Sequence, residues 1–253
     1  MARRFVLRGM DGVIGTAGWS IPGKDSAAFP GEGTALERYS RIFPGVEINS
    51  SFHRPHRASV WAKWAASVPD SFRFAVKVPK TITHQAKLVD CEALTAQFAE
   101  EVKPLGAKLA VLLVQLPPKL GFDSGVAERF FTHLRGITDA RIACEPRNAS
   151  WFGDEADALL DRLLVARVAA DPALMPAAAV PGGWPGLAYW RLHGSPAMYR
   201  SAYPDSALIA YAGQMRAAAR DGGAAWCIFD NTAASQATAN ALSLMKKLSP
   251  PPE

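Results

Sequence analysis

Cysteine is scarce in this sequence, and the three cysteines present form no recognisable framework. Cys91, Cys144 and Cys227 are an odd number, lie far apart and show neither a Cys-x-x-Cys pair nor a Cys/His spacing. Disulfide-stapled domains and structural zinc sites need closely and regularly spaced ligands. We therefore expect three reduced cysteines buried as small apolar residues.

Long apolar runs are also missing. The longest, Leu109 to Leu116, is interrupted by Gln115 and is far shorter than the about 18 residues that a membrane helix requires. The first four residues carry positive charge, but Arg8 and Asp11 break the apolar stretch that a signal peptide would contain. We expect no membrane partner and a cytoplasmic location.

The dinucleotide-binding fingerprint and strong charge clustering are absent as well. The stretch "GTAGWS" after the first apolar run lacks the full Gly-x-Gly-x-x-Gly pattern, so no nucleotide cofactor is expected. The net charge of +5 and the pI near 9.2 mildly favour anionic partners, either a small anionic substrate or, with weaker support, nucleic acid. The basic residues are scattered, which is typical of a solvated surface.

What the sequence does contain is the composition of an ordinary globular protein, with 49% apolar and 20% charged residues among 253. Short β-like runs alternate with segments of helical periodicity, the pattern of parallel βα units. The predicted strands are Val13–Gly15, Val46–Asn49, Phe72–Val78, Leu109–Gln115, Arg141–Glu145, Ala166–Ala170, Ala188–His193 and Ala225–Phe229. The predicted helices are Thr34–Phe43, Ala58–Val68, Glu92–Leu105, Val126–Leu134, Asp154–Leu164, Asp205–Arg220 and Ala233–Leu248.

Eight such units in this length predict an α/β protein with a single (β/α)8 barrel, a TIM barrel, as one domain over 1–253. Its core is expected at about 13–248, with 249–253 as a frayed tail. The stretch 171–186 is rich in proline and glycine and predicts a loop with little helix. An open doubly wound sheet is the structural alternative.

Polar side chains gather where the apolar strands end. Because side chains alternate along a strand, residues two apart, such as Glu145 and Arg147, share a face. In a closed barrel that face is the lumen, and barrel enzymes place their active sites at this end. The predicted set comprises Glu47, Asn49, Lys77, Gln115, Glu145, Arg147, Asp171, Arg191, His193 and Asn231. The competing interpretation is a plug of internal ion pairs.

Several motifs together resemble the YecE-like family, the family of domain of unknown function 72. They are, in order, "GTAGW", "VEINSSF", "FRFAVKVPKTITH", "QLPP", "EPRNASW", "YWRLHG", "MYRSAY" and "FDNTAASQATANA". The resemblance covers about 15–248 and implies a TIM barrel, but no reaction. It adds Trp19, His84, Trp151, Tyr199 and Tyr203 to the motif positions. His53 and the loop after Trp19 depart from the aromatic residues that are usual there.

The residue types allow two kinds of chemistry. Lys77, Arg147 and Arg191 suit an anionic oxygen group such as a phosphate, whereas carboxylates and an imidazole suit proton transfer or a divalent metal. We predict an enzyme acting on a phosphorylated or otherwise anionic substrate, with its class as hydrolase, lyase or isomerase left open. The predicted catalytic residues are Glu47, Glu145, Asp171 and His193. The predicted substrate-binding residues are Trp19, Asn49, Lys77, His84, Gln115, Arg147, Trp151, Arg191, Tyr199, Tyr203 and Asn231.

Three alternatives stay open at this point. The four predicted catalytic residues are also the candidates for a divalent metal site, although the intermixed cations argue against crowded metal ligands. The chain can also be a ligand-binding protein without catalysis. In the third alternative the basic surface and pocket bind nucleic acid, which would make binding strongly salt-dependent.

Overall fold

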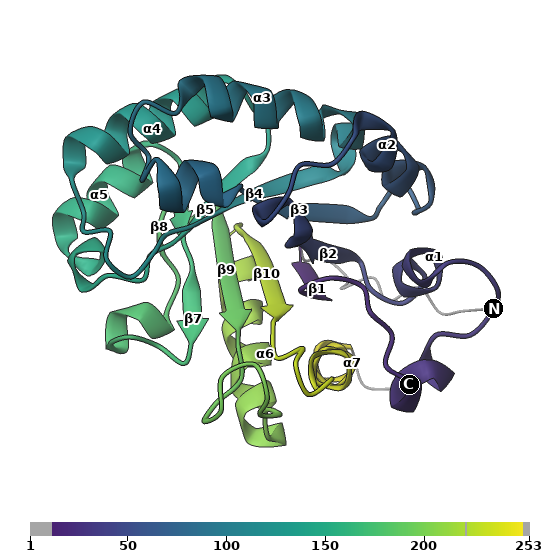
Figure 1. The fold of residues 1–253 in the computed structure, drawn as a ribbon. Helices are drawn as coiled ribbons and strands as arrows, with labels where there is room; N and C mark the ends of the chain where they lie inside the picture. The colour runs from purple at the N-terminus through teal and green to yellow at the C-terminus, as the bar shows by residue number, and fades with distance from the viewer. Residues whose placement is uncertain (1–11, 221, 250–253) are drawn as a thin grey trace.

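The computed structural model describes residues 12–220 and 222–249, and in this part the chain is a mixed α/β fold with two sheets (Figure 1). The first eleven residues, on which the expectation about a signal peptide rests, lie outside the described residues. The predicted frayed tail, apart from Ser249, lies outside them too. None of the helices in the described ranges is both long and apolar enough to cross a bilayer.

The strands pair in two sheets, and all but one of the pairs are parallel. The four-stranded sheet has the order β1 (Gly12–Thr16), β10 (Ala224–Phe229), β9 (Leu187–Leu192) and β7 (Ala169–Asp171). The six-stranded sheet has the order β2 (Gly45–Ile48), β3 (Arg73–Lys77), β4 (Leu109–Gln115), β5 (Arg141–Glu145), β6 (Val165–Arg167) and β8 (Gly182–Gly183). The short β8 runs antiparallel to β6.

The two sheets meet at two places. At the first, Ala17 and Glu47 form a parallel bridge, and the amide of Gly18 donates to the carbonyl of Glu47 at 2.8 Å. At the second, Val168 separates β6 from β7, and its amide donates to the carbonyl of Cys144 at 2.8 Å. The predicted strand Ala166–Ala170 is thus found as two short strands, because its first half pairs with β5 and its second half with β9.

Helices cover the outer side of both sheets. In Figure 1 the helices α2 to α5 arch over the six-stranded sheet, while α6 and α7 lie beside β9 and β10. The α-helices are α1 (Ala35–Ser40), α2 (Ala58–Ala66), α3 (Glu92–Val102), α4 (Ser124–Gly136), α5 (Asp154–Arg162), α6 (Asp205–Arg220) and α7 (Ala237–Leu248). Short helical turns are η1 (Gly23–Ala28), η2 (Ser50–Phe52), η3 (Thr81–Gln85), η4 (Lys103–Lys108), η5 (Ala149–Phe152) and η6 (Pro176–Ala179).

The helix ends differ from the predicted ones by a few residues for local reasons. Helix α1 begins after Thr34, whose hydroxyl accepts from the amide of Glu37 while the Glu37 carboxylate accepts from the amide of Thr34. This capping box satisfies amide groups that the first turn leaves free. Helix α7 begins at Ala237 instead of Ala233, because Ser235, with φ of 55°, lies in a turn.

The proline- and glycine-rich crossover between β7 and β9 contains η6 and β8 but no α-helix, as the sequence predicts. Arg167, which is 3% exposed, holds this loop to the body of the protein. Its guanidinium donates to the carbonyl of Ala177 at 2.8 Å and to both carboxylate oxygens of Asp157 at 2.7 and 3.1 Å. The crossover is therefore attached by buried polar contacts in place of a packed helix.

Two separate apolar clusters show which face of each strand points inward. One cluster is enclosed between the sheets, and the other fills the space between the sheets and the helices. Within the inner cluster the rings of Tyr189 and Trp226 stack with centroids 5.8 Å apart. The residues of the inner cluster are Val13, Ala75, Val111, Leu113, Ala143, Ala166, Val168, Leu187, Tyr189, Ala224, Trp226 and Ile228.

Strands β1 and β2 approach each other so closely that only glycine fits between them. A Cβ atom at Gly15 would overlap the carbonyl oxygen of Gly45. The buried hydroxyl of Tyr39 also lies here, accepting from the amide of Thr16 at 2.9 Å and donating to the carbonyl of Gly45 at 3.3 Å. Backbone contact at this point joins the two sheets.

We predict that Gly15→Ala lowers the free energy of unfolding by about 2–3 kcal/mol, because the added methyl group overpacks a backbone contact. Gly213→Ala is the control, since Gly213 lies exposed inside α6 with no atom near its added Cβ, and alanine there stabilises by up to about 1 kcal/mol. Urea denaturation measures both. Equal stability of the two variants would contradict the close approach.

Candidate active site

The charged side chains of the site continue the inner face of the strands. Because alternate residues share a face, Tyr189 of the inner cluster is followed on the same side by Arg191 and His193, and Ala143 is followed by Glu145. Residues Glu47, Glu145, Arg191 and His193 are each 0% exposed. The ends of these strands therefore carry a buried polar layer directly above the inner apolar cluster.

Arg191 lies at the centre of this layer and binds three carboxylates. Its Nη2 and Nε donate to Glu47 at 2.7 and 3.0 Å, and its Nη1 donates to Glu145 Oε2 at 2.6 Å. A third contact runs from Nη2 to Asp230 Oδ2 at 3.1 Å. The hydroxyl of Tyr189 completes the set by donating to Glu47 at 2.9 Å. A planar guanidinium with five donors is the side chain that can serve several carboxylates at once.

This pairing keeps the buried carboxylates charged. Burial alone would raise the pKa of Glu145, but the guanidinium groups of Arg191 and Arg147 outweigh it and hold that pKa well below the usual range. Burial likewise opposes ionisation of Asp230, whose pKa is nevertheless lowered by Arg191 and by the hydrogen bond from His193. The pKa of Arg191 is raised in turn, because its carboxylate partners outweigh the effect of burial.

His193 is held between two carboxylates and one guanidinium. Its Nδ1 lies 3.0 Å from Asp230 Oδ2, and its Nε2 lies 3.2 Å from Glu145 Oε1 and 3.0 Å from Arg147 Nη2. Burial lowers the pKa of the imidazole, but the hydrogen bonds to Asp230 and Glu145 outweigh it, so the pKa is raised overall. Protonated Nε2 can donate to Glu145, and neutral Nε2 can accept from Arg147. The ring can therefore exchange a proton without losing a partner.

Lys77 is the cation of this layer that makes no direct contact with a carboxylate among the described residues, although Glu47, Glu145 and Asp230 attract it from a longer distance and oppose the fall of its pKa. Its side chain is 9% exposed, and its Nζ lies 4.1 Å from the centre of the Phe52 ring. Its ammonium forms no hydrogen bond or ion pair within the described part of the chain. Burial, and then repulsion from Arg191, lowers its pKa to about 8. A buried ammonium of this kind gains strongly from an anionic ligand.

Other predicted residues surround Lys77. The ring of His84 lies 5.0 Å from the Phe52 ring, and burial together with the nearby Lys77 lowers the pKa of His84. The Oδ1 atom of Asn49 is buried without a hydrogen-bond donor within the described ranges. Gln115 pairs in register with Glu145 at the end of β4. On this side of the layer, fewer side-chain hydrogen bonds are formed among the residues that the structure describes than around Arg191.

Asp171, Asn231 and Tyr203 are not brought together with Arg191. Asp171 pairs in register with Leu192, whereas Arg191 pairs with Ala170, so Asp171 points to the opposite face of its strand. There its carboxylate accepts from the hydroxyl of Tyr203 at 2.6 Å. Tyr203 also accepts from the amide of Gly194 at 2.8 Å, and Asn231 donates to the carbonyl of Ser201 at 2.9 Å. These three residues support the loop 194–203.

The predicted aromatic residues divide into two groups. Tyr199, 41% exposed and with φ of 65°, places its ring 5.7 Å from that of His193, so it stands beside the layer. Trp151 is buried and donates from its ring nitrogen to the carbonyl of Leu120 at 3.0 Å, which ties two loops together. Trp19 packs its ring edge-on to Trp64 at 5.1 Å.

Two members of the layer, Asp230 and Tyr189, were not predicted from the sequence. Their signal is the alternation along the strands, because Asp230 follows the inward residues Trp226 and Ile228 at spacings of two, whereas Asn231 follows the outward Phe229. Tyr189 precedes Arg191 by two residues and shares its face. Applying the alternation strictly would have selected Asp230 in place of Asn231.

The four candidate metal ligands do not form a metal site. Within 12–220 and 222–249, no group of three or more His, Cys, Asp or Glu side chains is arranged to hold a metal ion. The guanidinium of Arg191 lies between Glu47 and Glu145 and uses their oxygens, while Asp171 lies on the other face. A cation at this position would compete with Arg191.

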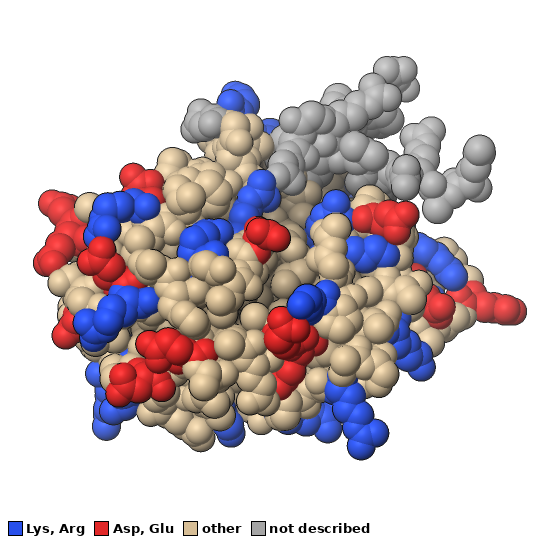
Figure 2. All heavy atoms as spheres, turned by 90° about the horizontal axis from the view of Figure 1, so that it is seen from above, with Lys and Arg blue, Asp and Glu red and all other residues tan. Residues whose placement is uncertain are grey.

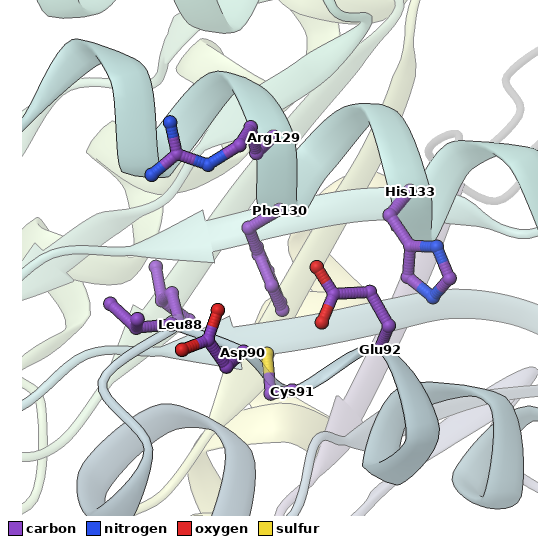
Figure 3. A pocket seen from close by; sticks show the side chains of 8 residues that line it. Leu88, Asp90, Cys91, Glu92, Arg129, Phe130 and His133 are labelled. Atoms are coloured by element: carbon purple, nitrogen blue, oxygen red, sulfur yellow. The ribbon is translucent and has the colours of Figure 1, made fainter.

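Two of the hollows in the described part of the surface differ in what they can hold. Figure 3 shows the one between the start of α3 and α4, where Asp90, Cys91 and Glu92 lie opposite Phe130 and His133. Its volume of about 20 Å³ suffices for about one water molecule. A second, open hollow of about 420 Å³ lies at the ends of β1 and β2 and is lined by Trp19 and Asn49.

Comparison with known proteins agrees with this arrangement of the chain. The family model described as "Protein of unknown function DUF72" matches residues 13–253. The chain belongs to the DUF72 family. Among curated proteins, this DUF72 chain is 36% identical over 88 residues to the UPF0759 protein YecE of Escherichia coli, covering 35% of this chain and 32% of that protein. It is 34% identical over 152 residues to the UPF0759 protein YunF of Bacillus subtilis, covering 55% of this chain and 51% of that protein.

These matches span about a third of YecE and about half of YunF. Solved structures are similar over nearly the whole DUF72 chain. A DUF72 family protein from Enterococcus faecalis has a TM-score of 0.79 with 22% identity, covering 94% of this chain and 95% of that one. One from Thermotoga maritima has a TM-score of 0.75 with 22% identity, covering 94% and 98%. At this identity the likeness shows a shared fold.

We predict that Arg191→Met lowers the free energy of unfolding by about 3–5 kcal/mol, because it leaves the buried carboxylate of Glu47 without a paired cation and removes one of the two guanidinium groups that pair with Glu145. Tyr189→Phe is the matched control, since it removes one hydrogen bond to Glu47 while Arg191 remains, at a cost of about 1.5 kcal/mol. Chemical denaturation at neutral pH measures both. Similar losses in the two variants would contradict the central role of Arg191.

We predict that His193 adds stability mainly at acidic pH. Because its pKa is raised in the folded state, its contribution is fully present below the unfolded pKa of about 6.5 and is lost as the pH rises through the folded pKa. Melting temperatures of the wild type and His193→Gln, measured from pH 5 to pH 9, should therefore differ most at the acidic end. A difference that is constant with pH, or that grows with pH, would contradict the raised pKa.

Proposed function

We propose that this protein is a cytoplasmic enzyme of a single (β/α)8 barrel that acts on a small phosphorylated or otherwise anionic substrate. The substrate binds at the carboxyl ends of the strands. The observation that carries this proposal is the buried ammonium of Lys77, which forms no direct ion pair among the described residues and lies beside a charged layer that holds a histidine. Each part of the proposal has its own support.

The single barrel is supported by the two places where the sheets meet. The order β1-β2-β3-β4-β5-β6/β7-β9-β10 returns to β1, if the bridge from Ala17 to Glu47 and the division at Val168 are taken as contacts within one closed ring. The inner apolar cluster then fills the lumen, as side chains fill the interior of such barrels. The polar layer becomes the top of that lumen.

Anion binding is assigned to Lys77 and Arg147. Lys77 supplies a point charge. Arg147, whose side chain is 20% exposed, forms an ion pair with Glu145 through Nη2, so only its other nitrogens are assigned to an incoming oxygen. The Nε of Arg147 is buried without an acceptor among the described residues. Phosphate and carboxylate groups match this combination of a fork and a point charge. We assign the remaining oxygens of such a ligand to Gln115, the register partner of Glu145, and to His84, which lies near Lys77.

Proton transfer is assigned to His193, with Glu145 as its exchange partner and Asp230 as the group that orients the ring. A general base needs a second residue that fixes its tautomer, and the Nδ1 contact with Asp230 supplies this. Glu47 and Arg191 hold the layer together and touch no ligand in this scheme. Because the hydrogen bonds to Asp230 and Glu145 raise the pKa of His193, the protonated ring is favoured over that of a free histidine, which suits His193 to act first as an acid.

The runner-up is a protein that binds an anion without converting it. This alternative is supported by the ion pairs within the layer. Arg191 already pairs with Glu47, Glu145 and Asp230, so these carboxylates are engaged in holding the structure together. Nucleic acid is less well supported. On the described part of the face in Figure 2, basic and acidic side chains alternate without forming a continuous basic stripe.

Binding of inorganic phosphate tests the anion site. We predict that phosphate binds the wild type at pH 7 and that Lys77→Met weakens it at least about tenfold, the loss of about 1.4 kcal/mol of charge interaction. Affinity of the wild type should fall as the pH rises through about 8, because the ammonium loses its charge, whereas Lys77→Arg should remain independent of pH there. Isothermal titration calorimetry measures all three proteins. Unchanged binding by Lys77→Met would remove the anion site.

Turnover separates an enzyme from a binding protein. A panel of phosphate monoesters and sugar phosphates is incubated with wild type and followed by ³¹P and ¹H NMR, with His193→Gln and Asp230→Asn as variants. We expect one compound to be converted by the wild type, and His193→Gln to abolish conversion while its phosphate affinity stays within about threefold. A compound that binds at Lys77 and is never converted would favour the binding protein.

A further inference from the structure

A hollow next to Lys77 has no role in the function proposed above. It is open, has a volume of about 420 Å³ and lies where β1 and β2 end. Its lining is mostly apolar and comes from two loops that are brought together by the bridge between Ala17 and Glu47. The lining residues are Ala17, Gly18, Trp19, Ser20, Ala35, Ile48, Asn49 and Ser50.

The hollow and Lys77 are connected through one short turn of the chain. Asn49 and Ser50 line the hollow, and the turn η2 continues to Phe52, whose ring lies 4.1 Å from Lys77 Nζ. Between them, the hydroxyl of Ser51 donates to the carbonyl of Lys77 at 2.7 Å. The register of β2 and β3 also places Asn49 beside Lys77, one step beyond the pair of Ile48 and Val76. Asn49 is therefore a neighbour of Lys77 in the sheet and at the same time part of the lining of the hollow.

Two features of the lining point to a ligand. Trp19 is only partly buried and contacts Trp64 with its rings crossed, which leaves part of its indole surface on the hollow. The Oδ1 atom of Asn49 is buried and accepts no hydrogen bond among the described residues. A buried acceptor without a donor is costly, and aromatic walls with a few polar groups are typical of small-molecule sites.

We propose that this hollow is the second half of the substrate site and takes a flat, uncharged ring attached to the anionic group. The volume is sufficient, because a cavity of about 150 Å³ already holds benzene and small-molecule sites start at about 300 Å³. The ring lies against Trp19, next to the side chain of Asn49. This proposal rests on the anion site at Lys77 and names its substrate class as a ring-bearing phosphate or carboxylate.

The test compares inorganic phosphate with phenyl phosphate and aminophenyl phosphate by isothermal titration calorimetry at pH 7. We expect the better of the two ring compounds to bind the wild type at least about tenfold more tightly than inorganic phosphate. Trp19→Ala should remove this gain and leave the affinity for inorganic phosphate within about twofold. Trp19→Phe should keep most of it, because a flat aromatic wall remains.

A second variant covers the case in which Trp19→Ala does not fold. Ala35→Leu enlarges an exposed residue at the start of α1 that lines the hollow, so it fills the space without removing any packing. We expect this variant to bind inorganic phosphate as the wild type does and to lose the gain from the ring. Thermal unfolding of each variant confirms that it is folded.

The outcomes separate the two proposals. Ring compounds that bind no more tightly than inorganic phosphate, while phosphate still depends on Lys77, would overturn the ring site and leave the anion site intact. A gain that survives in both Trp19→Ala and Ala35→Leu would overturn the placement in this hollow. Phosphate that fails to bind, or binds Lys77→Met equally well, would overturn the anion site, and the ring site with it.

Discussion

The buried contact between Arg191 and the carboxylates of Glu47, Glu145 and Asp230 is the interaction on which the rest of the site depends. A charged group in the interior is costly unless partners surround it. Glu47 comes from β2, Glu145 from β5 and Arg191 from β9, so the contact joins both sheets. The same ion pairs that hold the strand ends together also fix the charge of the groups around His193.

A buried network of this kind has opposite consequences for its members. Arg191 and Glu47 are so fully bonded that they have no capacity left for a ligand, and they act as a frame. Lys77, Arg147 and His193 lie at the margin of the network. Among the described residues, Arg147 keeps an unbonded Nε and part of its surface exposed, and the ammonium of Lys77 contacts the Phe52 ring without forming an ion pair. The function proposed here depends on this difference between the centre and the margin, which separates a catalytic layer from a mere plug of ion pairs.

Much of the fold could be predicted from the sequence because apolar runs and helical periodicity follow directly from burial. The α/β class and the helix-poor crossover were found in this way. The division of the sixth strand at Val168 was not, because it depends on which neighbour each half pairs with, and "ARVAA" reads as one continuous strand. The paired strand ends at Glu145 and Arg191 were predicted because polar residues there contrast with the apolar strands before them.

The differences between the predicted residues and the charged layer around Arg191 have a common physical cause. Asp171 and Asn231 were selected by their position after a strand, although a shift of one residue reverses the face of a β-strand. Asp230 was missed for the same reason. The contact of Asp171 with Tyr203 and the absence of a donor at Asn49 depend on tertiary packing, which spacing along the chain does not reveal.

The loop 194–203 is held in place by hydrogen bonds to helix α7, on the side of the sheet that the helices cover. Tyr203 exchanges hydrogen bonds with Asn240 of α7, and Asn231 donates to the same side chain. The only ring that this loop brings to His193 within the described chain, that of Tyr199, is thus anchored by residues that never touch the charged layer. Substitutions at Tyr199 can therefore change the surface beside His193 while the ion pairs around Arg191 keep all of their partners.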